Sequence, residues 1–153
     1  MTPIQLRQER YDAGEILPGI KVPPITRLLD AKIESHDTQT AVLRCSYGSR
    51  PEFANPRNAV NGGILAAMMD DAMNCLILAQ NGGERLQAST DLHTSFFKPV
   101  PIGPRVLVEA RIDRMGRSVA FTSAVALNDD TGEVLAKAIH TSTFAPPAPA
   151  RGA

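Results

Sequence analysis

Residues 55–70 read NPRNAVNGGILAAMMD and join a polar loop, a Gly-Gly pair and the start of a long apolar helix. Asn61 precedes the pair Gly62-Gly63, and Asp70 follows about two helical turns later, where a core helix would normally carry an apolar residue. The N–H groups at the start of a helix bind anions and oxyanions. A partly dry carboxylate nearby is a candidate general base. The segment therefore predicts attack of water on an acyl group.

The hydrophobic pattern around this segment predicts one long helix and about six strands. Apolar residues recur at helical spacing over 62–80, around most of the circumference, and Asn81-Gly82-Gly83 is a suitable C-terminal stop. Strand patterns begin at residue 26 and cover 40–47, 86–99, 105–114, 118–128 and 134–144. Short turns between the last four make them antiparallel neighbours. The expected fold class is α+β, with an antiparallel sheet wrapped around one long central helix.

The length of 153 residues predicts one main domain with two flanking segments. Residues 1–24 read as a short amphipathic helix (2–13) followed by an irregular linker rich in Gly and Pro (14–24). Residues 25–144 hold the helix and strand patterns. Residues 145–153 carry three prolines and are expected to form a disordered tail.

Composition argues against several classes of protein. Lys and Arg together number 16, as do Asp and Glu, and aromatic residues make up 5%, which disfavours a nucleic-acid binder. Cys45 and Cys75 form no CxxC motif and read as buried free thiols in a reducing compartment. The polar N-terminus resembles no signal peptide, and we expect no apolar run to span a membrane. We therefore expect a soluble, cytoplasmic protein.

Two motifs give the chain a family resemblance. Asn55, Gly62, Gly63 and Asp70 match the spacing of an Asn, a His-Gly-Gly triplet and an acid. Residues 89–99, STDLHTSFFKP, match a strand pattern of Ser/Thr-x-Asp followed by apolar, aromatic and Pro positions; Gly103 and the turn Gly116-Arg117 also fit. The chain thus resembles the hotdog-fold acyl-CoA thioesterases of the PaaI-like, phenylacetate-pathway group over roughly residues 28–144.

The resemblance implies a set of catalytic roles. The Gly62 N–H and Asn55 would polarise the thioester carbonyl, and Asp70 with Ser89 would orient and activate water. Direct attack by Asp70 on the carbonyl is an alternative. In the family the base comes from the partner subunit, so a homodimer or a dimer of dimers (a homotetramer) is implied. Coenzyme A enters as part of the substrate, and no cofactor or metal is implied.

The resemblance also implies further substrate contacts, and some of the polar residues could instead have a structural role. The remaining substrate-binding positions are Asn61, Gly63, Met73, Thr90 and Arg117. Asn61 replaces the family His, and it can cap a helix but cannot titrate near neutrality. Asp70 could instead be a structural carboxylate. Asp71 points about 100° away around the helix, and we expect it at an interface or in solvent.

Thioester chemistry suits so few titratable groups. A thiolate leaving group has a pKa of about 8.5 and needs no strong acid to protonate it. His36, His93 and His140 lie in separate segments and show no metal-ligand spacing. Two alternatives stay open. One is a non-catalytic acyl-CoA binding or sensing module. The other is an acyl-thioester hydratase or dehydratase. Those enzymes pair a catalytic His with an acid, and this chain has Asn rather than His at position 61, which disfavours them.

Overall fold

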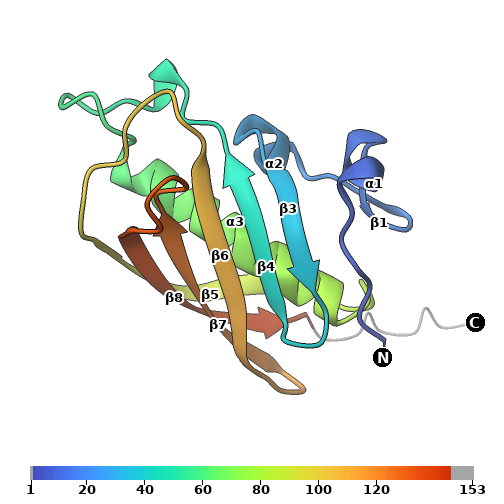
Figure 1. Ribbon diagram of the computed structural model, residues 1–153. Coiled ribbons are helices and arrows are strands. Elements are labelled where there is room, and N and C mark those ends of the chain that lie inside the picture. The colour runs from blue at the N-terminus through green and yellow to red at the C-terminus, as the bar shows by residue number, and fades with distance from the viewer. Residues whose placement is uncertain (1, 146–153) are drawn as a thin grey trace, which may run out of the picture.

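The computed structural model describes residues 2–145 and forms a six-stranded antiparallel sheet packed against one long helix (Figure 1). The strand order is β3-β4-β6-β7-β8-β5. The strands are β3 (Lys32–Asp37), β4 (Val42–Tyr47), β5 (Gln87–Phe96), β6 (Val106–Met115), β7 (Val119–Leu127) and β8 (Val134–Phe144). The α+β class and the strand number predicted from sequence are confirmed. Apart from Ala145, the predicted tail lies outside the described residues.

The central helix α3 (Gly62–Gln80) has the bounds that the sequence predicts, because both of its ends are marked chemically. Asn61 is the N-cap, and its Oδ1 accepts from the N–H of Gly63 at 2.8 Å and from that of Ile64 at 3.4 Å. At the other end, Gly82 and Gly83 adopt φ values of 69° and 74°. Their N–H groups donate to carbonyls of the last helical turn, which ends the helix.

The core lies between α3 and the concave side of the sheet. Met68, Met69, Met73 and Leu76 of the helix have no exposed surface. The strands opposite them supply small buried residues at alternate positions, namely Ala120, Ala124 and Ala126 of β7 and Ala136 and Ala138 of β8. Small side chains on the sheet leave room for the long methionines of the helix, which fill the space between the two layers.

By length and composition, α3 is apolar enough to cross a membrane, contrary to the expectation that no segment would be. In this fold it is instead the core helix: 61% of its apolar window is buried inside the protein. Its all-round apolar character follows from that burial.

The N-terminal segment differs from prediction and packs into the same core. The helix α1 is only Gln8–Asp12, and the expected linker contains a hairpin of β1 (Glu15–Leu17) and β2 (Ile20–Lys21). Where a strand was expected from residue 26, the chain forms α2 (Pro24–Leu28), because proline favours the first helical position. Buried residues of this segment that join the main core are Leu6, Ile16, Leu17 and Val22.

Strand β5 lies at one edge of the sheet and contains a bulge that positions the site. Within residues 2–145 it pairs only with β8, and most of its residues are exposed. Ser89 lies opposite Ser142 and Leu92 lies opposite His140, with the extra residue between Ser89 and Asp91. The bulge shifts the alternation by one, so Ser89 and Leu92 both face the helix.

Candidate active site

Asp70 of α3 meets the hydroxyl of Ser89 on β5. Ser89 Oγ donates to Asp70 Oδ1 at 2.9 Å. Asn74, one helical turn further on, donates from Nδ2 to the Asp70 backbone carbonyl at 3.0 Å and to Ser89 Oγ at 3.2 Å. The Asp70 side chain is 33% exposed, and its Oδ2 has no hydrogen-bond partner among the described residues. One carboxylate oxygen is therefore held by the protein while the other is open to water.

Behind Ser89 lies His140 of β8, a site residue that the sequence analysis missed. Its Nε2 lies 2.8 Å from Ser89 Oγ and 3.4 Å from Asp70 Oδ1, and its Nδ1 lies 2.8 Å from Thr122 Oγ1. The His140 side chain has no exposed surface. Burial lowers its pKa, although the negative charges of Asp70 and Asp91 act in the opposite direction. The imidazole is accordingly neutral at neutral pH.

A second group of predicted residues lines a pocket of about 290 Å³ at the N-terminus of α3. Gly62 and Asn55 both line it, together with the exposed aromatic side chains of Phe96 and Phe97. A Cβ on residue 62 would lie 3.1 Å from the Phe96 ring, so glycine allows the ring to approach the backbone. The Asn61 side chain accepts from the N–H groups of Gly63 and Ile64, and the N–H of Gly62 is not among its donors.

Asn55 is also the turn residue that its position before proline indicates. Its Oδ1 accepts from the N–H of Arg57 at 2.9 Å and from that of Ala59 at 3.1 Å. These two bonds fix the orientation of the carboxamide. Its Nδ2 has no acceptor within residues 2–145, so this donor is available to a ligand in the pocket.

The two predicted parts of the site are separated along the helix. Gly62 and Asp70 are eight positions apart (70 − 62), which corresponds to about 12 Å along the axis and about 80° around it beyond two full turns. A single carbonyl carbon cannot touch both within one chain. The structure thus brings Asp70 to Ser89 and Asn55 to Gly62, as two half-sites.

Asp71 corrects the sequence-based expectation of an interface or solvent residue. It is 9% exposed, and both of its oxygens are hydrogen-bonded inside the protein. Thr26 Oγ1 donates to Oδ1 at 2.6 Å, and the Tyr47 hydroxyl donates to Oδ2 at 2.9 Å. Burial raises the pKa of Asp71, and the two hydroxyl donors act against that rise. Asp71 is the satisfied structural carboxylate, linking α3 to α2 and β4.

The other predicted substrate contacts lie in varied surroundings. Met73 is fully buried in the core and does not line the Gly62 pocket. Thr90 is the bulge residue, and its hydroxyl donates to the Thr141 carbonyl at 3.1 Å rather than to Asp70. Gly63 is exposed at the start of α3. Arg117 is exposed in the turn between β6 and β7, and its carbonyl accepts from Arg85.

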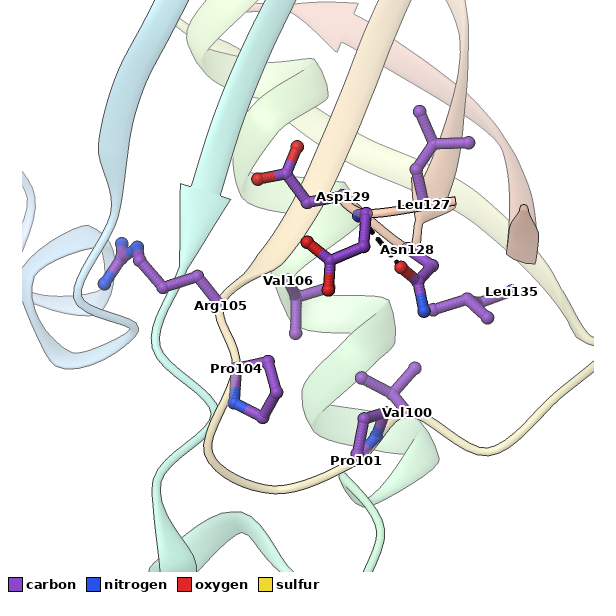
Figure 2. Close-up of a pocket in the computed structure, with 10 residues that line it drawn as sticks. Val100, Pro101, Pro104, Arg105, Val106, Leu127, Asn128, Asp129 and Leu135 are labelled. Carbon is purple, nitrogen blue, oxygen red and sulfur yellow. Dashed lines mark hydrogen bonds between the residues drawn. The ribbon is translucent and has the colours of Figure 1, made fainter. Parts of the chain in front are cut away.

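Another pocket, of about 340 Å³, lies between the β5–β6 loop and the β7–β8 turn (Figure 2). It contains none of the predicted catalytic residues. Arg105 points away from the other lining residues in Figure 2, and its guanidinium is held by Asp30 at 2.6 Å and by Ser46. Within residues 2–145, no group of three or more His, Cys, Asp or Glu side chains could hold a metal ion.

A helix enclosed by an antiparallel sheet of this strand order is the hotdog-type fold found in thioesterases. The Thioesterase superfamily description matches residues 58–135, more than half of the chain, so the chain belongs to the thioesterase superfamily. The match contains α3, with Gly62 and Asp70, and also Ser89. The resemblance inferred from the two motifs is thereby confirmed.

Relatives and solved structures agree with this assignment. Acyl-coenzyme A thioesterase 13 of Mus musculus is 26% identical over 121 residues, covering 79% of this chain and 85% of the relative. The crystal structure of a phenylacetic acid degradation-related protein from Ralstonia eutropha JMP134 is 30% identical, with a TM-score of 0.75, covering 80% of this chain and 90% of that chain. The E. coli PaaI protein has a TM-score of 0.72 at 15% identity, covers 81% of this chain and 88% of its own, and supports the fold alone.

Proposed function

We propose that the protein hydrolyses acyl-CoA thioesters to a free acid and coenzyme A. The observation that carries the proposal is the Asp70–Ser89 pair, a hydrogen-bonded carboxylate with one oxygen open to solvent, in a chain of the thioesterase superfamily. The mouse relative named as an acyl-coenzyme A thioesterase supports coenzyme A as the thiol portion of the substrate.

The chemistry follows from what each half-site offers. The Gly62 N–H and the free Asn55 amide donate to the thioester carbonyl, which favours the tetrahedral oxyanion. Asp70 takes a proton from water as the water oxygen bonds to the carbonyl carbon. The C–S bond then breaks, and the thiolate leaves without a strong acid because the pKa of its conjugate thiol is only about 8.5. A direct attack by Asp70, giving an anhydride that water opens, uses the same residues.

The separation of the two half-sites supports a site shared between two protomers. About 12 Å along α3 keeps Gly62 and Asp70 of one chain from acting on one carbonyl. In an isologous dimer formed through the exposed edge strand β5, the start of one α3 can approach the middle of the other. We infer that Gly62 and Asn55 act with Asp70 and Ser89 of the second copy, as the family resemblance implies.

His140 gives the hydratase alternative one observation in its favour, because those enzymes pair a histidine with an acid. Its Nε2 lies 3.4 Å from Asp70 Oδ1, but its side chain has no exposed surface and lies behind Ser89. A buried imidazole cannot reach a substrate carbon, so the arrangement favours hydrolysis. The binding-module alternative drew on Asn61, which here has a structural role as the cap of α3.

A thiol-release assay with a panel of acyl-CoAs tests the proposed function. We expect saturable release of coenzyme A from some of these thioesters, with acyl-chain preference set by the pocket. Tight binding of acyl-CoA without release by the wild-type protein would establish the binding module instead.

Subunit mixing tests the shared site. Asp70→Asn and Asn55→Ala proteins are each expected to be nearly inactive, yet a hybrid dimer would contain one intact site. Random mixing should restore about a quarter of the wild-type rate, because half of the dimers are hybrids with one working site of two. No recovery in a mixture shown to contain hybrid dimers, or a monomer by light scattering at micromolar concentration, would contradict the shared site.

A further inference from the structure

We propose that His140 is a positioning residue whose single tautomer, selected by Thr122, makes Ser89 donate its proton to Asp70. The inference rests on the proposed function for its catalytic consequence, but the hydrogen-bond chain itself stands on the geometry. The three links are Thr122 Oγ1 to His140 Nδ1 at 2.8 Å, His140 Nε2 to Ser89 Oγ at 2.8 Å, and Ser89 Oγ to Asp70 Oδ1 at 2.9 Å.

The direction of each link follows from counting protons. A carboxylate only accepts, so the single Ser89 proton is used on Asp70. Ser89 Oγ must then accept from His140, which requires the proton of the neutral ring to be on Nε2. The Nδ1 atom is left as an acceptor, and the Thr122 hydroxyl donates to it. Ser142 Oγ, 3.1 Å from Nε2, accepts a weaker branch of the same N–H.

The surroundings keep the ring neutral and the inner part of the hydrogen-bond chain dry, whereas at its outer end Ser89 is exposed and Asp70 is partly exposed. His140, Thr122 and Ser142 have 2%, 1% and 0% of their surface exposed. Burial lowers the pKa of His140, whereas the charges of Asp70 and Asp91 raise it. Asn74 Nδ2 adds a second donor to Ser89 Oγ at 3.2 Å. With donors from both His140 and Asn74, the acceptor positions of the Ser89 oxygen are used within the protein.

The other tautomer would remove the donor from Asp70. With its proton on Nδ1, His140 would present a bare Nε2 to Ser89, and the Ser89 hydroxyl would turn toward the imidazole. The Asp70 carboxylate would then lose the bond that fixes its rotamer and aims Oδ2 at solvent. Thr122 disfavours this, because its buried hydroxyl would lose Nδ1 as an acceptor; Ser142 would gain Nε2, but at the longer distance of 3.1 Å against 2.8 Å for Thr122, so the shorter contact decides the tautomer. The neutral acceptor next to it is Nδ1.

Amide substitutions at residue 140 separate this role from simple packing. In His140→Gln the amide nitrogen lies close to the place of Nε2 and can still donate to Ser89. In His140→Asn the amide reaches only the place of Nδ1, so the Ser89 link is lost while the Thr122 link can remain. We expect kcat for acyl-CoA hydrolysis to fall about 10- to 100-fold in His140→Asn and about threefold or less in His140→Gln, with KM nearly unchanged in both.

A double-mutant comparison asks whether His140 acts through Ser89. In a Ser89→Ala background, His140→Asn should lower kcat by less than about twofold, because the residue through which it acts is gone. Thr122→Val, which keeps the shape and removes the hydroxyl, should lower kcat by about three- to tenfold, and Thr122→Ser should restore it. Equal losses in His140→Gln and His140→Asn at equal melting temperature would overturn the proposal.

An independent readout needs no turnover. Nitrogen-15 spectra of the imidazole report which ring nitrogen carries the proton; we expect Nε2–H in the wild-type protein and an increased share of Nδ1–H in Thr122→Val. A wild-type ring that is protonated on Nδ1, or on both nitrogens at pH 7, would overturn the proposal even if every variant at residue 140 failed to fold. An Nε2–H ring in a protein that hydrolyses no acyl-CoA would refute the proposed function and leave the proton chain in place.

Discussion

Asp70 and Asp71 are neighbours in sequence, yet the fold gives them opposite surroundings. Asp70 is one-third exposed and bonded through one oxygen to Ser89 on the edge strand β5. Asp71 is almost fully buried, and both oxygens are bonded, to Thr26 of α2 and Tyr47 of β4. A rotation of about 100° around α3 separates a carboxylate that can touch a ligand from one that ties three elements together.

The contrast teaches that an acid in an apolar helix is not by itself a catalytic signal. Both residues break the hydrophobic pattern equally in the sequence. What distinguishes them is whether an oxygen is left over after the protein has formed its own bonds. Asp70 keeps one oxygen for water, and Asp71 keeps none.

The largest expected loss of stability comes from Asp71→Leu. The change leaves two buried hydroxyls, Thr26 and Tyr47, without their acceptor, at about 1–3 kcal/mol each. Denaturant unfolding should show a decrease of roughly 2–5 kcal/mol, while kcat per folded molecule stays within about threefold. Tyr47→Phe, which removes one bond only, serves as the control and should cost about 1–2 kcal/mol. A fall in kcat without a loss of stability would reverse the roles of the two acids.

Ser89→Ala removes the hydrogen-bond donor of Asp70 and should lower kcat strongly. Without the hydroxyl, the carboxylate loses its fixed bond and the water loses a neighbour, so kcat should fall about 10- to 100-fold. Thr90→Ala is the matched control one position away, because the Thr90 hydroxyl is used within the sheet. Steady-state kinetics with one acyl-CoA would show the difference, and equal losses in both variants would argue against a specific role for Ser89.

The sequence predicts the local parts of this fold well and the long-range parts poorly. The ends of α3 are predictable because Asn61 and the Gly82-Gly83 pair act through neighbouring backbone groups. The contact of His140 with Ser89 is hidden in the sequence, because it depends on strand pairing and on the bulge beside Ser89. The alternation of exposed and buried residues along β8, which turns His140 inward, is visible only in the folded sheet, because the apolar Ile139 lies on its exposed face.

The buried position of Asp71 differs from the sequence-based expectation for a related reason. Its partner Thr26 reads as the start of a strand in the sequence, whereas proline starts the short helix α2 there. Without α2 there is no hydroxyl to receive the Asp71 side chain, and solvent is the natural expectation. Within one chain the two half-sites are about 12 Å apart along α3, so local spacing does not predict that they act together, and the role of Asn55 follows only from the family resemblance.

Acid should destabilise the protein through two buried histidines, His36 on β3 and His140 on β8. Burial lowers the pKa of both His36 and His140. A lowered folded-state pKa means that the unfolded chain binds the proton first, so stability is retained above about pH 6.5 and is lost as the pH falls toward the folded-state values. In that window the free energy of unfolding falls by up to about 1.4 kcal/mol for each histidine and each pH unit of acidification.

Melting curves between pH 7.5 and pH 5.5 measure this effect. The His36→Asn variant keeps an acceptor for the Leu6 N–H, which bonds His36 Nδ1 at 2.9 Å, and removes the titration. Its melting temperature should depend less on pH than that of the wild-type protein, and His93→Gln, at an exposed position, should behave as wild type. A stability that rises as the pH falls from 7 would contradict the assignment.

The smallest expected effect is at the helix cap. Asn61→Ala removes the acceptor for the N–H groups of Gly63 and Ile64 and should cost about 1 kcal/mol of stability. Asn61→Asp keeps the cap and should retain stability. Both should keep most of their activity if residue 61 only shapes the loop. A large loss of kcat in a stable Asn61→Asp protein would show that the amide itself contacts the substrate.

The most direct measurement compares Asp70→Asn and Asp71→Asn, with kcat and melting temperature determined on the same preparations. We expect Asp70→Asn to lower kcat by about 10²–10⁴-fold at an unchanged melting temperature and to keep acyl-CoA binding, because a positioned base is lost from a nearly isosteric side chain. We expect Asp71→Asn to lower the melting temperature and to leave kcat within about threefold. A stable Asp70→Asn protein that turns over acyl-CoA at a near wild-type rate would contradict the role of Asp70 as the base.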